Sequence, residues 1–187
     1  MENKYKVLAL FGKSGAGKDT IQKWLTTNYN MNGIISCTTR PPRDYERDGI
    51  HYHFLSNEEF AQKVLNMSML EATVFNDWCY GTPIESLKED KINVGVFNIQ
   101  GIECLLQDNK LDILPIFIDC SDKTRLLRNI KREKVPNCLE ICRRFITDEK
   151  DFSDINFDYI TFDNNNDRNR GFYGILNLPT VKEFLTS

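Results

Sequence analysis

The sequence predicts an α/β fold in which helices cover both faces of a parallel sheet. Three observations carry this prediction. Apolar runs of strand length alternate with segments of helical periodicity, a glycine-rich turn joins the first run to the first helical segment, and residues 33–90 interrupt the alternation. A chain of 187 residues, with 41% hydrophobic and 27% charged residues, is long enough to bury one sizeable core. We therefore expect one domain with an inserted segment.

The individual elements follow from these patterns. Buried parallel strands are expected at Val7–Phe11, Gly95–Ile99, Ile113–Asp119 and Tyr159–Phe162. Helices are expected at residues 18–29, 101–108, 122–132 and 138–150, with a last one after Pro179. The inserted segment has candidate strands at Ile34–Ser36, Ile50–Phe54 and Leu70–Phe75, and its Ser56-Asn57-Glu58-Glu59 is a helix capping box. In such folds ligands bind beyond the carboxyl ends of the strands.

A glycine-rich loop after the first strand is the strongest functional signal. With the residue that follows, it reads Gly12-Lys13-Ser14-Gly15-Ala16-Gly17-Lys18-Asp19-Thr20. Glycines let the main chain approach phosphate oxygens, the free N–H groups and the positive end of the next helix attract an anion, and Lys18 adds a point charge. We therefore predict that residues 12–20 bind the phosphates of ATP.

Asp19 occupies the position where such loops carry Ser or Thr, whose hydroxyl binds Mg²⁺. A carboxylate is a good ligand for this hard cation, but it also places negative charge beside a triphosphate. Thr20 offers a hydroxyl one residue later, in a different direction on the helix. We expect Mg²⁺ as the cofactor that accompanies ATP, with Asp19 as the candidate metal ligand, and the manner of metal binding stays open here.

Charge and apolar patterning restrict the partners. The net charge of −3 and the pI of about 5.5 give no general nucleic-acid footprint. No apolar run approaches the ~20 residues of a membrane span, and the N-terminus lacks an apolar signal region. Six cysteines without a CxxC pair predict free thiols rather than a metal cluster. We expect a cytoplasmic protein that binds small molecules, with no nucleic acid, no membrane and no obligate protein partner.

A second motif lies in the inserted segment. It consists of Ser36-Cys37-Thr38-Thr39-Arg40-Pro41-Pro42-Arg43, then Gly49-Ile50-His51-Tyr52-His53-Phe54, Glu71, Tyr80-Gly81-Thr82 and, after a buried strand, Gln100-Gly101. With these motifs in this order, residues 5–163 resemble the guanylate kinase family. The resemblance implies a P-loop kinase with a central five-stranded parallel sheet flanked by helices, a small mixed-sheet insertion that binds a nucleoside monophosphate, and a helical lid.

These residue types suit a nucleoside monophosphate without reference to the family. Arg40 and Arg43 offer planar forks to a dianionic phosphate, and Tyr52 adds a hydroxyl donor. Glu71 can accept two N–H groups from a planar base, which suits the N1 and N2 edge of guanine. The resemblance implies the same roles and gives the GMP-binding set Ser36, Arg40, Arg43, Tyr52, Glu71, Tyr80, Thr82 and Asn98. Surface charge, strand packing or a plain turn is the alternative interpretation of these positions.

Two positions depart from the family pattern Asp-x-Asp before Gln100-Gly101, because this chain has Val96 and Asn98 there. Asn98 keeps a carbonyl oxygen that can accept a bond from the guanine amino group, but its NH₂ group can also donate to another base. The first acid of this pattern is associated with the metal region, and Val96 cannot replace it. Asp19 is a candidate to supply the missing carboxylate near Mg²⁺. Base and sugar specificity therefore stay open.

The resemblance also divides the chain and assigns the catalytic charges. It implies a single domain with a monophosphate-binding subdomain at 33–90, a lid at 129–142 and a core of 1–32, 91–128 and 143–187. The expected catalytic set is Lys18, Arg40, Arg43, Arg128, Arg132 and Arg144. The last three align with arginines of the family's covering segment, which would clamp the transferring phosphoryl group. The expected reaction transfers the γ-phosphoryl group of ATP to GMP or dGMP, chiefly by alignment and charge neutralisation.

Two other functions fit the sequence. A deoxynucleoside monophosphate kinase with altered base specificity has the same build, and Asn98 and Asp19 motivate it. A non-catalytic guanylate kinase-like module would instead recruit partner proteins. Such modules commonly lose the loop lysine, whereas Lys18 is present here.

Overall fold

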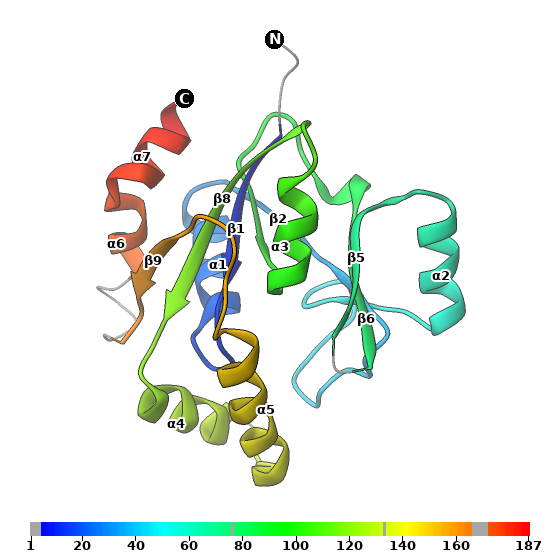
Figure 1. Cartoon of the computed structure of the whole chain (residues 1–187), viewed down its shortest axis with the longest axis vertical. Coiled ribbons are helices and arrows are strands. Elements are labelled where there is room, and N and C mark those ends of the chain that lie inside the picture. The colour runs from blue at the N-terminus through cyan, green and yellow to red at the C-terminus, as the bar shows by residue number, and fades with distance from the viewer. Residues whose placement is uncertain (1–4, 76, 133, 166–171) are drawn as a thin grey trace.

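The computed structural model describes residues 5–75, 77–132, 134–165 and 172–187 (Figure 1). The central sheet contains β1 (Tyr5–Phe11), β2 (Asn32–Gly33), β7 (Asn93–Val96), β8 (Leu111–Asp119) and β9 (Ile160–Asp163). These strands are all parallel and lie in the order β2-β7-β1-β8-β9. The predicted five-stranded parallel sheet is therefore confirmed for the described part of the chain.

Helices cover both faces of this sheet, as Figure 1 shows. They are α1 (Lys18–Asn28), α3 (Ile99–Leu106), α6 (Phe172–Asn177) and α7 (Pro179–Thr186). Leu8 and Leu10 of β1 are fully buried in one apolar cluster with α1, α6 and α7. Val7 and Ala9 point to the opposite face and pack in a second cluster with α3. Burial on both faces explains why β1 reads as a continuous apolar run.

A second, smaller sheet lies beside the core. It contains β3 (Cys37–Thr38), β4 (His53–Phe54), β5 (Met69–Phe75) and β6 (Trp78–Pro83), in the order β4-β3-β6-β5. The β3–β4 pair is parallel and the other two pairs are antiparallel, so the sheet is mixed, as predicted. Two short helical elements accompany it, α2 (Asn57–Leu65) and the 3₁₀ turn η1 (Ile84–Ser86). The predicted capping box is present, with Ser56 and Glu59 exchanging hydrogen bonds at 3.1 and 2.8 Å.

Two further helices, α4 (Asp122–Arg132) and α5 (Cys138–Asp151), lie past the carboxyl ends of the central strands (Figure 1). The glycine-rich loop follows β1 and therefore reaches the same edge. The small sheet, the loop and this helix pair surround the region where ligands of parallel α/β sheets bind.

Several elements differ from the sequence prediction. The elements β2, η1 and α6 were not predicted, and only His53–Phe54 of the strand expected at Ile50–Phe54 forms β4. Three other differences have a clear physical reason. The strand expected at Gly95–Ile99 ends at Val96, because Asn98 leaves the sheet and caps α3. The strand expected at Ile34–Ser36 is replaced by β3, since the N–H of Ile34 bonds to β7 of the central sheet instead. The strand β6 was not predicted, because its Tyr80-Gly81-Thr82 and Pro83 have the composition of a turn.

The described residues include no helix with the length and apolar character needed to cross a bilayer. All six cysteines are free thiols, as predicted, and Cys37 and Cys120 are buried.

Candidate active site

One large cavity lies beyond the carboxyl ends of the central strands, with a volume of about 740 Å³. The glycine-rich loop, the small sheet and the helices α4 and α5 all contribute to its wall. Lys13, Ala16 and Thr82 lie outside this wall. The other predicted site residues line it: Gly12, Ser14, Gly15, Gly17, Lys18, Asp19, Thr20, Ser36, Arg40, Arg43, Tyr52, Glu71, Tyr80, Asn98, Arg128, Arg132 and Arg144. The tertiary structure thus brings the two predicted motifs together in a single cavity.

The loop follows a path that requires glycine. Gly12 and Gly17 have φ values of 144° and 98°. A Cβ at Gly12 would lie 2.5 Å from the carbonyl oxygen of Ile118, and one at Gly17 would lie 2.5 Å from the side-chain nitrogen of Asn164. The loop is therefore packed tightly against the ends of β8 and β9, and larger residues would displace it.

Cations hold the carbonyl oxygens of the loop. The Lys18 ammonium donates to the carbonyls of Gly12 and Lys13 at 2.6 and 3.1 Å. Arg128 donates to the carbonyls of Gly15 and Ala16 at 3.5 and 3.2 Å. Burial lowers the pKa of Lys18, although the nearby carboxylates of Asp19 and Asp148 act in the opposite direction.

Several N–H groups of the loop are available to a ligand. Within the part of the chain that the structure describes, the N–H groups of Gly15, Gly17, Lys18 and Asp19 have no hydrogen-bond partner. These residues line the cavity at the N-terminus of α1. Unpaired N–H groups at a helix N-terminus attract anions, because the helix dipole adds to their own partial charge. This end of the cavity can therefore bind phosphate.

A buried carboxylate gathers the two arginines of the second motif. Glu46, whose side chain is 4% exposed, forms ion pairs with Arg40 at 3.0 Å and with Arg43 at 3.2 Å. Burial acts to raise the pKa of Glu46, but hydrogen bonds from Arg40 and from the Arg43 N–H lower it below its usual value. The Nε of Arg40 is buried without a partner among the described residues. The two arginines thus concentrate positive charge in the cavity wall, with one buried nitrogen of Arg40 left unpaired among the described residues.

Aromatic side chains line the wall next to these arginines. The ring centroids of Tyr52 and Tyr80 are 6.1 Å apart, and the Arg40 guanidinium is 5.7 Å from the centroid of Tyr52. Burial raises the pKa of the Tyr52 hydroxyl, with a further contribution from Asp19. The hydroxyl is therefore a donor at neutral pH.

A buried carboxyl group lies deeper in the small-sheet end of the cavity. Glu71 is 8% exposed, and it accepts a hydrogen bond from the Thr82 hydroxyl at 2.7 Å. Ser36 and Thr82 are themselves 3.3 Å apart. Burial raises the pKa of Glu71 to about 7, and the Thr82 bond opposes this rise. Thr82 is the one side-chain donor to this carboxyl among the described residues, so its oxygens can accept N–H groups of a ligand.

Asn98 lies at the same end but its amide is already occupied. Its carbonyl oxygen accepts the N–H of Gly101 at 2.6 Å, and its NH₂ group donates to Thr73 at 2.9 Å. Both groups of the Asn98 side chain thus already have a partner within the protein, unlike the free contact that the sequence suggested.

The α4–α5 side of the cavity supplies further positive charge. Arg144 donates to Glu140 at 2.8 Å, and Glu140 also forms an ion pair with Arg143. Hydrogen bonds from these two arginines lower the pKa of Glu140 to about 2. One nitrogen of Arg144 is buried without a partner among the described residues. Arg132 lies over the ring of Tyr45 at 5.1 Å, so the end of α4 contacts the inserted segment.

The residues near the loop fit a magnesium ion held mainly by other ligands. Asp19 is exposed in the first turn of α1 and lines the cavity. Within the described ranges, no group of three or more His, Cys, Asp or Glu side chains has the arrangement of a metal site. Mg²⁺ usually takes one or two carboxylates and completes its shell with water and substrate phosphates. A single carboxylate at Asp19 suits that mode of binding.

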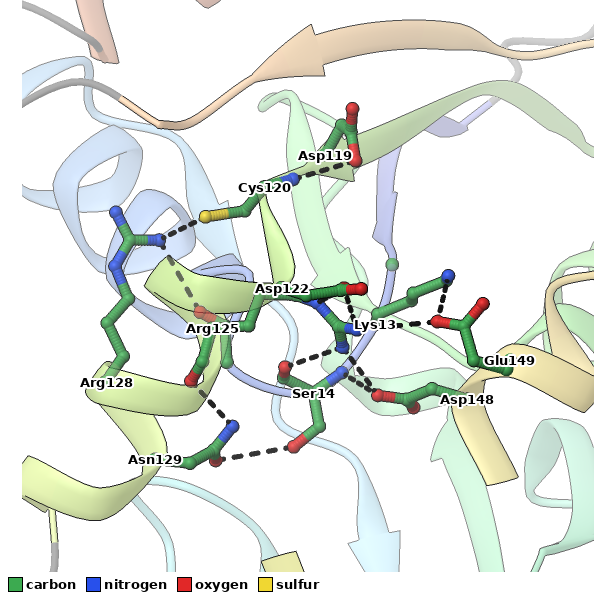
Figure 2. A network of polar contacts seen from close by, with 12 residues as sticks. Lys13, Ser14, Asp119, Cys120, Asp122, Arg125, Arg128, Asn129, Asp148 and Glu149 are labelled. Carbon is green, nitrogen blue, oxygen red and sulfur yellow. Dashed lines mark hydrogen bonds and ion pairs between the residues drawn. The ribbon is translucent and has the colours of Figure 1, made fainter. Parts of the chain in front are cut away.

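Sequence reasoning missed Arg125, Asp148 and Asn164 in this site, and it assigned no role to Glu46. Arg125 and Asp148 are buried and contact the glycine-rich loop, as Figure 2 shows. Asn164 is also buried and donates to the carbonyl of Ala16 in this loop. Charged residues on helices are mostly exposed, so the sequence alone gives no reason to single out Arg125 or Asp148. The informative feature is opposite charge on two facing helices, and it becomes visible only once α4 is known to pack against α5.

A parallel sheet, a glycine-rich anion loop at its carboxyl edge and a facing arginine pocket together define a P-loop nucleotide kinase. A guanylate kinase family model matches residues 4–170. The chain is 34% identical to the guanylate kinase of Helicobacter pylori over 166 residues, which are 86% of this chain and 80% of that protein. It is 30% identical to the guanylate kinase of Campylobacter jejuni over 161 residues, 82% of this chain and 78% of that protein. The chain belongs to the guanylate kinase family.

The fold agrees with this assignment. The crystal structure of guanylate kinase from Anaplasma phagocytophilum matches with a TM-score of 0.69 and 21% sequence identity, over 100% of this chain and 89% of that one. At this identity the match supports the fold, and the family assignment depends on the sequence relatives.

Proposed function

We propose that this protein transfers the γ-phosphoryl group of ATP to GMP or dGMP, giving ADP and GDP or dGDP. Family membership supports ATP-dependent phosphoryl transfer to a nucleotide. The observation that carries the proposal for this chain is that one cavity contains both the anion loop and the arginine pocket with Glu71 beyond it. Two phosphate sites in one cavity suit a donor and an acceptor held together. Free thiols favour a reducing compartment, so we place the reaction in the cytoplasm.

The donor end of the cavity would hold the phosphates of ATP. The unpaired N–H groups of the loop and the Lys18 ammonium would contact the β- and γ-phosphates. Lys18 already bonds to loop carbonyls, so its charge lies beside the phosphate site. Mg²⁺, held by Asp19, water and phosphate oxygens, would supply charge neutralisation on the β- and γ-phosphates.

The acceptor end would hold the monophosphate. Arg40 and Arg43 would grip the phosphate of GMP with Tyr52 as a further donor, since their present partner, Glu46, leaves a nitrogen of Arg40 unpaired. Glu71 would accept the N1 and N2 hydrogens of guanine in its ionised form. Thr82 lies outside the cavity wall and its hydroxyl donates to Glu71, so it would hold this carboxyl in place rather than contact the base.

The arginines of α4 and α5 would act on the transferring group. Arg132 and Arg144 line the cavity, and Arg144 has a buried nitrogen without a partner among the described residues. Closure of residues 33–90 and 129–142 over the cavity would bring these charges to the phosphoryl group and exclude water. Arg128 bonds to loop carbonyls, which fits support of the loop better than direct contact with substrate.

A coupled ADP-release assay tests the proposal. ATP is supplied with GMP, dGMP, AMP, CMP or dTMP in parallel, and kcat/KM is compared. We expect GMP and dGMP to exceed the other acceptors by roughly 10⁴-fold, because a buried polar group such as Glu71 is left unpaired by the wrong base. A preference for another base would instead favour the deoxynucleoside monophosphate kinase alternative. The structure supports that alternative through Asn98, because both groups of its amide already have partners within the protein.

Two lysine variants on α1 provide a test of the reaction and a matched control. Lys18→Met should lower kcat/KM by roughly 100-fold or more, since it removes a charged donor from the phosphate site. Lys23→Met changes an exposed lysine of the same helix and should leave turnover unchanged. Turnover that survives Lys18→Met, or no turnover with any acceptor, would refute the proposed reaction and leave the non-catalytic binding module as the better account.

A further inference from the structure

A buried ion pair joins α4 and α5 directly behind the glycine-rich loop, as Figure 2 shows. Arg125 is fully buried, and Asp148 is 8% exposed. The two side chains are 2.9 Å apart. Neither residue belongs to the two motifs, and a charge pair in this position is costly to desolvate. Packing alone therefore does not explain why this charge pair is buried here.

Both members of the pair contact the main chain of Ser14. Asp148 accepts the N–H of Ser14 at 2.8 Å, and Arg125 donates to the carbonyl oxygen of Ser14 at 3.2 Å. The other nitrogens of Arg125 bond to Asp122, and its guanidinium lies 4.3 Å from the ring centroid of Phe145. The guanidinium is therefore fixed in one orientation, with one edge toward the loop.

These two contacts fix two consecutive peptide planes. A trans peptide points its C=O and its N–H in opposite directions. The bond from the Ser14 N–H to Asp148 thus turns the carbonyl of Lys13 to the other side, where it accepts from Lys18. The bond from Arg125 to the Ser14 carbonyl turns the N–H of Gly15 toward the phosphate site.

The second of these planes is the one that most needs support. Gly15 has a φ of 81° and no side chain to hinder rotation. Reversal of the peptide between Ser14 and Gly15 would remove one donor from the phosphate site and place a carbonyl oxygen there instead. The guanidinium of Arg125 opposes that reversal, because it would lose a charge-assisted bond.

We propose that Arg125 and Asp148 are positioning residues that hold the Ser14 peptides and thereby set the affinity of the loop for the phosphates of ATP. This inference rests on the proposed function only in taking ATP as the ligand of the loop. It requires no contact between either side chain and the nucleotide.

The test separates positioning from stability. In the variant Arg125→Met/Asp148→Leu, apolar side chains replace the whole pair, a change that is often neutral or stabilising for the fold. We expect a urea midpoint at or above that of the wild type. We also expect a 10- to 100-fold weaker Kd for an unreactive ATP analogue by calorimetry, roughly the effect of one or two charge-assisted bonds. The Kd for GMP should stay within about twofold.

Two further variants control this result. Lys63→Met/Glu85→Gln removes an ion pair on the inserted segment, far from the loop in sequence, and should change neither affinity. Arg125→Lys keeps a cation beside Asp148, but one ammonium cannot serve Asp148, Asp122 and Ser14 together. It should weaken the ATP analogue several-fold, and it provides the test if the double variant does not fold.

The outcomes also distinguish this inference from the proposed reaction. Wild-type affinity for the ATP analogue in the folded double variant, or in Arg125→Lys, overturns the inference. A parallel loss of GMP affinity also overturns it, because that result indicates general distortion. If the wild type binds the ATP analogue and the variants do not, but no GMP is phosphorylated, the inference stands and the proposed reaction fails. If the wild type binds no ATP analogue, both fail.

Discussion

Replacing Glu71 with glutamine should stabilise the ligand-free protein at alkaline pH. Burial raises the pKa of this carboxyl from 4.5 to about 7. The folded state therefore binds the proton more tightly than the unfolded chain does. The resulting stabilisation is complete below the unfolded pKa, and it is lost as the pH rises through 7. At about 1.4 kcal/mol for each tenfold change in proton affinity, the full loss is about 3 kcal/mol.

Glutamine is neutral at every pH and still offers a carbonyl oxygen to the Thr82 hydroxyl. The free energy of unfolding of the Glu71→Gln variant should therefore exceed that of the wild type by up to about 3 kcal/mol near pH 8.5 and match it near pH 4.5. Urea unfolding at several pH values measures both proteins. Other titrating groups affect the two curves equally, so their difference isolates Glu71.

The variant Glu58→Gln is a matched control, because Glu58 is an exposed glutamate on α2. Its unfolding curve should follow the wild type across the same pH range. If the Glu71→Gln and wild-type stabilities run in parallel from pH 4.5 to 8.5, Glu71 is not a buried carboxyl with a raised pKa. The account of the base end of the cavity would then have to be abandoned.

Two further predictions concern the substrate sites. Asp19→Ala should raise the Mg²⁺ concentration for half-maximal turnover roughly tenfold, as expected for one lost carboxylate contact, and an unchanged Mg²⁺ titration would exclude Asp19 as a ligand. Arg43→Lys should raise the KM for GMP roughly 10- to 100-fold without changing the KM for ATP, because an ammonium cannot grip a phosphate bidentately. An equal rise in both KM values would contradict a specific role at the acceptor phosphate.

The parallel core could be predicted well because its signals are local. β1 and β8 are buried on both faces, so their apolar runs stand out in the sequence. Weak elements were misplaced where long-range contacts decide the conformation. The two-residue strand β2 has no apolar run of its own, and it forms because its neighbour β7 offers a free edge.

In the candidate site, too, local features could be predicted and long-range contacts could not. Glycine-rich and arginine-rich motifs were visible because their chemistry depends on neighbours in the chain. No role for Glu46 followed from its position in the chain, because its ion pairs with Arg40 and Arg43 form only in the folded segment. Asn98 looked like a free base contact, yet it caps α3 and bonds to Thr73.

By itself, the sequence determined the parallel core, the anion loop and the residues suited to a monophosphate, because backbone conformation and side-chain chemistry at those positions are local properties. Only the tertiary structure decided that the two motifs share one cavity, that Glu71 is buried enough for its pKa to reach about 7, and that Arg125 and Asp148 meet behind Ser14. These facts depend on desolvation and on distances between segments far apart in the chain, which periodicity and composition do not encode.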